Sequence, residues 1–202
     1  MTRKYIHILL LLAIGTLAGG VLRSPVIPPS IWAQSPATSS LKDNEELARL
    51  YKEDQSDRTP KDGKPIDWTV VGPRDRVREA RVKELYGNNQ LHTGADYYNV
   101  AMILQHGSAP EDYLLAHELC VIATSKGEGR AKWLAAASED RFLMSIGRPQ
   151  RFATQFRSEG PNGPIRLYQV DQGVTDEVRR ALDVPSLAEA KAREVKMNEK
   201  NK

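Results

Sequence analysis

The residues of this 202-residue chain that could do chemistry are polar side chains set into otherwise apolar helical patterns. Carboxylates, imidazoles and guanidinium groups can act in acid–base catalysis and stabilise developing charge. A hydrolytic site would use five of them, which are Asp54, Arg58, His106, His117 and Asp140. In the alternative, the polar positions only hold the fold, and that structural set is Asp54, Gln55, Asp57, Arg58, Gln105, Asp140, Arg141, Gln150 and Gln155.

Two histidines and a carboxylate suggest a metal site with His106, His117 and either Glu118 or Asp140 as ligands, because imidazole and carboxylate groups suit zinc and other transition metals. The spacing argues against such a site. His117-Glu118 begins like the helical motif of zinc proteases, but Val121 stands where that motif has its second histidine. The sequence therefore predicts structural histidines and no cofactor, with a divalent metal as the alternative.

Asp140 has the most informative surroundings of these candidates. On a helix expected over 130–145 it shares a face with Trp133 and Met144, so its carboxylate points toward apolar neighbours. A buried carboxylate requires a partner or a shifted pKa. We expect Arg58 to be that partner, which would join the first helix to the fifth.

No nucleophile motif accompanies these groups. The serines lack a G-x-S-x-G elbow, and the chain has neither a phosphate-binding loop nor a dinucleotide fingerprint. Cys120, the only cysteine, lies in the apolar run LCVIA, so we expect a buried small side chain and not a reactive thiol. A single cysteine also excludes an intramolecular disulfide.

Residues 1–33 have the layout of a secretory signal peptide. Arg3 and Lys4 precede an uncharged apolar run over 6–22, and we expect cleavage after Ala33. An uncleaved N-terminal membrane anchor is the alternative. Without this segment the chain has 26 basic and 26 acidic side chains, so its charge predicts no nucleic acid partner. We expect a periplasmic or secreted protein that has no membrane association after cleavage.

Hydrophobic periodicity predicts a mainly α-helical protein. The first five helices are expected over 43–58, 73–87, 96–106, 110–126 and 130–145, with an irregular loop over 59–72 before the second. Thr93 is expected to cap the third helix, and Ser108 with Glu111 to form a capping box on the fourth. The short connections between these helices predict antiparallel neighbours.

The part of the chain after residue 156 has a different pattern. Asn162-Gly163 lies between two short runs with strand character and predicts a small, irregular β-hairpin. Two short helices follow, one over 176–182 with Thr175 as its cap and one from Ser186 with a Ser186–Glu189 capping box.

These patterns predict one domain of the mainly α class, either an antiparallel helical bundle or a short αα-repeat-like array, with the small β-hairpin near its C-terminal side. The expected organisation is a signal peptide over 1–33, a flexible lead-in over 34–42, a single helical domain over 43–197 with its core over 94–156, and a frayed tail over 198–202.

Several short strings occur together between about residues 43 and 156. They are Asp54-Gln55-x-Asp57-Arg58, Gln105-His106-Gly107, AHEL over 116–119, Asp140-Arg141, Pro149-Gln150 and Thr154-Gln155. In order and approximate spacing this set resembles an uncharacterised bacterial family catalogued as domain of unknown function 6624. Members often have glycine before the Thr-Gln pair, whereas this chain has Ala153, and alanine argues against an unusual backbone angle there.

A helix pair between residues 98 and 137 also resembles a Sel1-type or TPR-like repeat, in which helix pairs stack and present a recognition surface. Neither resemblance implies an activity. The sequence therefore favours an exported helical domain of unknown function that binds an unidentified protein or peptide partner. The alternative is a hydrolytic, possibly metal-dependent, enzyme built on the His/Asp/Arg group.

Overall fold

The computed structural model describes residues 41–59, 65–160 and 163–199, and it confirms the mainly α fold class. The expected signal peptide over 1–33 and residues 34–40 of the expected lead-in lie outside this part of the chain, as does Asn162 of the expected hairpin turn. Within the described ranges, no helix has the length and apolarity that crossing a membrane requires.

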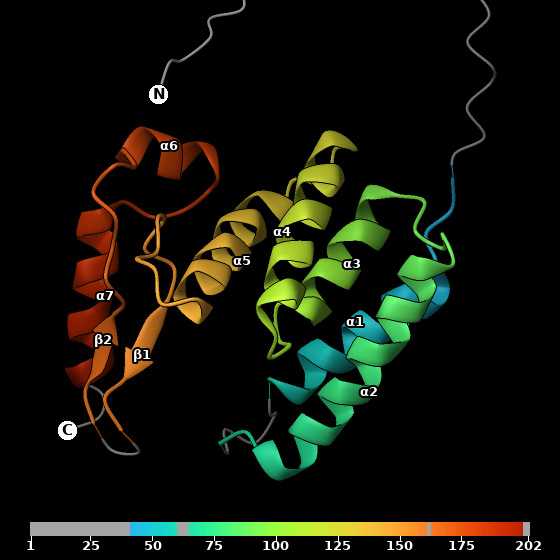
Figure 1. Cartoon of the computed structure of the whole chain (residues 1–202), viewed down its shortest axis with the longest axis horizontal. Helices are drawn as coiled ribbons and strands as arrows, with labels where there is room; N and C mark the ends of the chain where they lie inside the picture. Colours follow the sequence, from blue (N-terminus) through green and yellow to red (C-terminus); the bar gives the residue numbers. More distant parts are fainter. Residues whose placement is uncertain (1–40, 60–64, 161–162, 200–202) are drawn as a thin grey trace, which may run out of the picture. The chain divides into compact units, whose positions relative to one another are not determined.

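Figure 1 shows the order of the helices and of the single two-stranded sheet. The described elements are α1 (Glu45–Asp57), α2 (Trp68–Gly87), α3 (Gly94–Leu104), α4 (Pro110–Ser125), α5 (Ala131–Ser145), β1 (Phe156–Ser158), β2 (Ile165–Leu167), α6 (Asp176–Ala181) and α7 (Leu187–Glu199).

Local capping signals fix where several helices begin. At α3, the Thr93 side chain accepts from the Asp96 N–H, and Asp96 accepts from the Thr93 N–H, so the capping box is complete. Thr175 caps α6, and Ser186 forms the predicted reciprocal box with Glu189 at the start of α7. These three predictions are confirmed.

One predicted helix start and one predicted helix cap were wrong. α2 begins at Trp68 and carries Pro73 inside it, because Asp67 caps the helix by accepting from the Thr69 N–H, upstream of the proline. The expected loop over 59–72 is correspondingly shorter. At α4 the residue before the helix is Ala109, which provides no side-chain cap, and the helix starts on a proline whose fixed φ suits its first turn. The predicted Ser108–Glu111 box is not formed.

The main hydrophobic core lies where α3, α4 and α5 pack side by side with α1 and α2 against them (Figure 1). Its fully buried side chains include Leu47, Val100, Leu104 and Leu134. Cys120 is buried there as predicted, and burial raises the pKa of its thiol to about 12. The thiol is therefore protonated at neutral pH.

A second, smaller core lies on the other side of α5, where Ala136 packs with Phe152, Val174 and Val184. The hairpin pairs Phe156 with Leu167 in antiparallel register.

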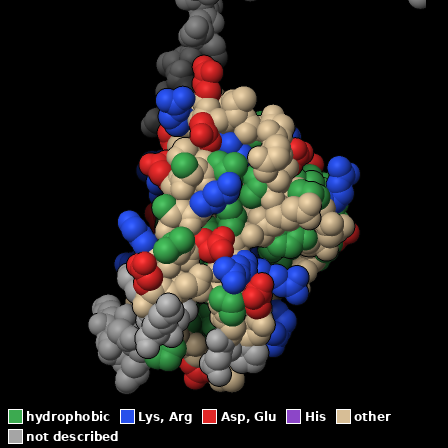
Figure 2. Space-filling model, turned by 90° about the vertical axis from the view of Figure 1, so that its left-hand side faces the viewer, with side chains coloured by type: hydrophobic (Ala, Val, Ile, Leu, Met, Phe, Trp, Pro, Cys, Tyr) green, Lys and Arg blue, Asp and Glu red, His purple; other side chains and the backbone are tan. Residues whose placement is uncertain are grey.

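Helix α7 holds the second strand of the hairpin. Asn198 bonds both the N–H and the C=O of Ile165, and Glu194 accepts from the Leu167 N–H. Figure 2 looks onto the side of the molecule that carries α6 and α7, where apolar side chains lie between charges of both signs.

Candidate functional site

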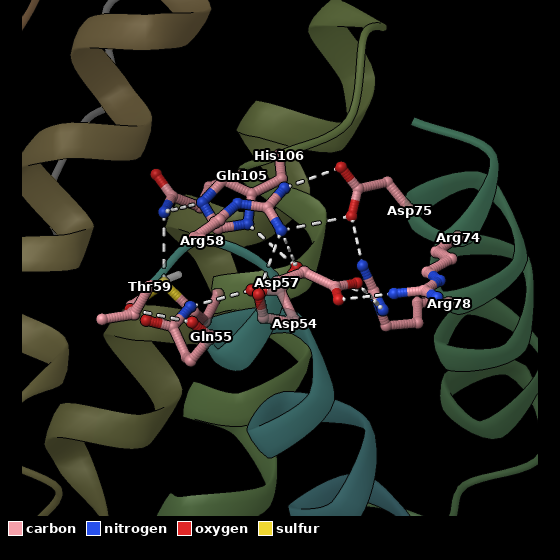
Figure 3. A network of polar contacts seen from close by, with 11 residues as sticks. Asp54, Gln55, Asp57, Arg58, Thr59, Arg74, Asp75, Arg78, Gln105 and His106 are labelled. Atoms are coloured by element: carbon pink, nitrogen blue, oxygen red, sulfur yellow. Dashed lines mark hydrogen bonds and ion pairs between the residues drawn. The ribbon is translucent and has the colours of Figure 1, made fainter. Parts of the chain in front are cut away.

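A balanced set of charges joins the C-terminal part of α1 to the N-terminal half of α2 (Figure 3). We call it the ion cluster, and its members are Asp54, Asp57, Arg58, Arg74, Asp75 and Arg78. Three carboxylates face three guanidinium groups, so the cluster carries no net charge. The pairing continues to His106, which lies just after the C-terminal end of α3.

Arg58 lies at the centre of the ion cluster. Its two terminal nitrogens donate to the two carboxylate oxygens of Asp75, at 3.2 and 2.7 Å, in the bidentate geometry that suits a guanidinium group. One of them also donates to Asp54 Oδ1 at 2.8 Å, across one turn of α1. This i, i+4 pair joins consecutive turns at the C-terminal end of α1. Burial tends to raise the pKa of Asp75, but the bonds from Arg58 and Arg78 outweigh it and lower that pKa.

Arg78 is the most buried arginine of the ion cluster, with 5% of its surface exposed. It donates to Asp57 at 2.9 Å and to Asp75 at 2.6 Å, while Arg74 donates to the other oxygen of Asp57 at 2.8 Å. Burial acts to lower the pKa of Arg78, yet these carboxylates raise it overall. Such buried networks hold a specific geometry, and losing one partner leaves another charge buried and unpaired.

His106 adds an imidazole to this network. Its Nδ1 lies 3.2 Å from Asp54 Oδ1, and its Nε2 lies 3.0 Å from the amide nitrogen of Gln105. An amide nitrogen only donates, so Nε2 must accept and Nδ1 carries the proton that bonds Asp54. An Asp–His pair of this kind can orient a general base. Here, however, the basic nitrogen already accepts the Gln105 hydrogen bond.

The other two candidate catalytic residues, His117 and Asp140, do not join this pair. His117 places its Nδ1 2.9 Å from the carbonyl oxygen of Ala135, which links α4 to α5. Glu118 is exposed on α4. Among the residues that the structure describes, no group of three or more histidine, cysteine or carboxylate side chains is arranged to hold a metal ion. The proposed five-residue constellation therefore divides into three separate sites.

Asp140 does not pair with Arg58, and that prediction was wrong. Its carboxylate accepts from the backbone N–H groups of Arg151 (2.7 Å), Phe152 (2.9 Å) and Thr154 (3.0 Å), and from the Thr154 hydroxyl (2.7 Å). Burial is the larger influence and raises the pKa of Asp140, although each of these donors favours the ionised form. Asp140 thus fixes the turn after α5, while Arg58 uses Asp54 and Asp75.

The same turn holds a residue that the sequence led us to treat as ordinary. Ala153 has φ 65°, a left-handed conformation that alanine rarely adopts. The bonds from Asp140 hold the residues on both sides of it. Gln150, fully buried, adds bonds to the Gln155 N–H and C=O and to the Tyr168 C=O. The expected backbone at Ala153 was wrong, and the expected structural role of the two glutamines agrees with these contacts.

Arg141 stands out because its charge is not matched by the described residues. It follows Asp140 on α5, and its Nε atom is buried without a hydrogen-bond partner in the described part of the chain. Burial lowers the pKa of this guanidinium, with Arg58 adding a repulsive contribution and Tyr113 an attractive one.

A groove of about 960 Å³ lies between α1 and α2, next to the ion cluster. We call it the α1–α2 groove; Leu50, Pro73 and Val77 are its apolar lining residues. Val77 is 70% exposed. The basic residues of its lining are Arg49, Lys52, Arg74, Arg78 and Arg81, and the acidic ones are Glu46, Glu53 and Asp57.

Sequence reasoning missed the α2 half of this region. Asp75 and Arg78 lie in a segment of the sequence with few apolar residues, and this scarcity could have indicated that its polar residues face another helix. Comparison with protein-family models, curated proteins and solved structures gave no match to this chain. The resemblance to domain of unknown function 6624 and to Sel1-type repeats therefore stays a prediction from the residues.

Proposed function

We propose that this protein is an exported helical module that binds an acidic peptide segment of a protein partner in the α1–α2 groove. The observation that carries the proposal is an exposed apolar residue, Val77, in a groove with more basic than acidic residues. Concave sites that combine apolar walls with a few charged groups are where ligands and partners commonly bind, and Val77 contributes exposed apolar surface to such a site.

The charge of the groove selects the kind of partner. Each of its acids is already paired, Glu46 with Arg81, Glu53 with Arg49, and Asp57 with two arginines of the ion cluster. Lys52 forms no ion pair with any other residue that the structure describes. The lining therefore presents a net positive surface around an apolar strip, which complements acidic side chains that flank an aliphatic one.

The hydrolytic alternative has weaker support. Only Asp54 and His106 of its proposed residues form an orienting pair, and the Nε2 atom that would act as the base accepts a hydrogen bond from Gln105. Binding a peptide, in contrast, requires only the apolar and charged residues that already line the groove.

A peptide-display selection against the chain tests the proposal. We expect enrichment of peptides with acidic residues on both sides of an aliphatic residue. Val77→Asp should weaken the binding of a selected peptide by about tenfold or more, because it removes an apolar contact and adds a negative charge that repels the acidic peptide. Val195→Asp is the matched control, since Val195 is 59% exposed on α7. Random peptides, or equal binding by Val77→Asp, would overturn the proposal.

A further inference from the structure

A second concavity, remote in sequence from the α1–α2 groove, lies between α5 and α7 and has a volume of about 150 Å³. We call it the α5–α7 pocket. Its walls are largely apolar and include Trp133 from α5, Phe156 from β1 and Ala190 from α7. A cavity of about this size accepts a molecule no larger than benzene, which is the size of one apolar side chain.

One wall of the α5–α7 pocket is the turn that Asp140 holds. Ala153 and Thr154 both line it, and Ala153 keeps its left-handed backbone at φ 65°. The buried carboxylate of Asp140 accepts from four donors of this turn. Burying an ionised group costs free energy, because the group loses its hydration. Strained backbone that is held in this way occurs preferentially at binding sites.

The rim of the pocket carries one acid and one base on consecutive turns of α7. Glu189 uses Oε2 to accept from the Ser186 N–H and hydroxyl, and its Oε1 accepts no hydrogen bond from the residues described. Arg193 lies over the Phe156 ring, 5.4 Å from its centroid, and joins no ion pair within the described ranges. Bonds from Ser186 lower the pKa of Glu189, so it is ionised at neutral pH.

We propose that the α5–α7 pocket binds a free apolar α-amino acid. The carboxylate of the ligand would pair with Arg193, its ammonium group with Oε1 of Glu189, and its side chain would enter the apolar pocket beside Trp133. The three groups of such a ligand match the three features of the site, and Glu189 and Arg193 are both exposed, so each can reach a ligand at the rim. Figure 2 shows the mixed charges of the side that carries α7.

This site is independent of the proposed function, because it shares no lining residue with the α1–α2 groove. Each proposal can fail while the other holds.

Titration of the full chain with L-leucine and L-phenylalanine, followed by calorimetry and tryptophan fluorescence, tests the inference. We expect saturable binding, and about tenfold or greater weakening for L-leucinamide and N-acetyl-L-leucine, each of which lacks one charge. The fluorescence change should vanish in Trp133→Phe and persist in Trp68→Phe, since Trp68 is an exposed tryptophan on α2.

Variants of α7 separate recognition from stability. Arg193→Gln and Glu189→Gln should each weaken the binding of L-leucine by about tenfold. In Glu189→Gln the glutamine can still complete the capping box with Ser186. Lys191→Gln is the matched control, an exposed position of the same helix that does not line the pocket. The inference is overturned if no amino acid binds at up to about 10 mM. It is also overturned if L-leucinamide and N-acetyl-L-leucine bind as well as L-leucine, or if Lys191→Gln weakens binding as much as Arg193→Gln.

Discussion

Replacing Asp140 by asparagine tests whether this buried carboxylate holds the fold. The carboxylate accepts from three backbone N–H groups and from the Thr154 hydroxyl. Asparagine retains one acceptor oxygen and places an NH₂ group where the second oxygen was. The Thr154 hydroxyl can rotate to accept from that NH₂ group, but the Thr154 N–H then faces another donor and loses its partner.

The size of the effect follows from that single lost acceptor. An unsatisfied buried donor costs about 1–3 kcal/mol. Part of this cost is offset because a neutral amide avoids the desolvation of a buried charge. We therefore expect the free energy of unfolding to fall by about 1–2 kcal/mol for Asp140→Asn. Asp140→Ala removes every acceptor and should cost at least about 3 kcal/mol.

Urea unfolding followed by circular dichroism at neutral pH measures both variants. Glu139→Gln is the control, because the neighbouring Glu139 binds the side chain of Arg151 at the surface, where Arg151 is 48% exposed. That change should stay within about 0.5 kcal/mol of the wild type. An Asp140→Asn protein with the stability of the control would refute the structural role and favour a functional one.

Because the pKa of Asp75 is lowered in the folded protein, its ion pairs stabilise the fold fully above the unfolded-state pKa of about 4, and this stabilisation is lost as the pH falls below that value. Asp75→Asn should therefore flatten the acid side of a stability–pH profile measured by urea unfolding. Arg141→Met should raise the urea midpoint, because methionine fills a similar volume and leaves no buried N–H group without a partner. Export with cleavage after Ala33 predicts that N-terminal sequencing of the exported chain begins at the next residue.

Each of these three expectations has a clear contrary result. An acid profile that is unchanged in Asp75→Asn would mean that Asp75 is not the group that titrates with folding. A lower midpoint for Arg141→Met would show that its guanidinium has a stabilising partner. A chain that keeps residues 1–33 would contradict cleavage.

Contacts within one or two turns could be predicted from the sequence, because both partners are set by the local spacing. The Thr93–Asp96 box, the Ser186–Glu189 box and the Asp54–Arg58 pair are of this kind. Proline at the start of α4 changed one such outcome, since its fixed φ allows a helix to begin without a side-chain cap.

Contacts between distant segments could not be predicted in the same way. Several carboxylates could lie near Arg58, depending on how the helices pack. The sequence provides no distances, so it cannot show that Asp75 and not Asp140 is the partner. The partners of Asp140 were harder still to foresee, because they are mainly backbone N–H groups, which every residue except proline possesses. The left-handed angle at Ala153 follows from those bonds and not from the residue type.

The ion cluster and the α1–α2 groove share Asp57, Arg74 and Arg78, so the charges that hold α2 against α1 are also charges that a partner would meet. A variant at any of these three would change folding and binding together, and its loss of binding would say little about recognition. Val77 and Lys52 also line the groove, but neither residue is a member of the ion cluster. Binding loss at these two positions with unchanged stability would therefore separate recognition by the groove from the packing of its walls.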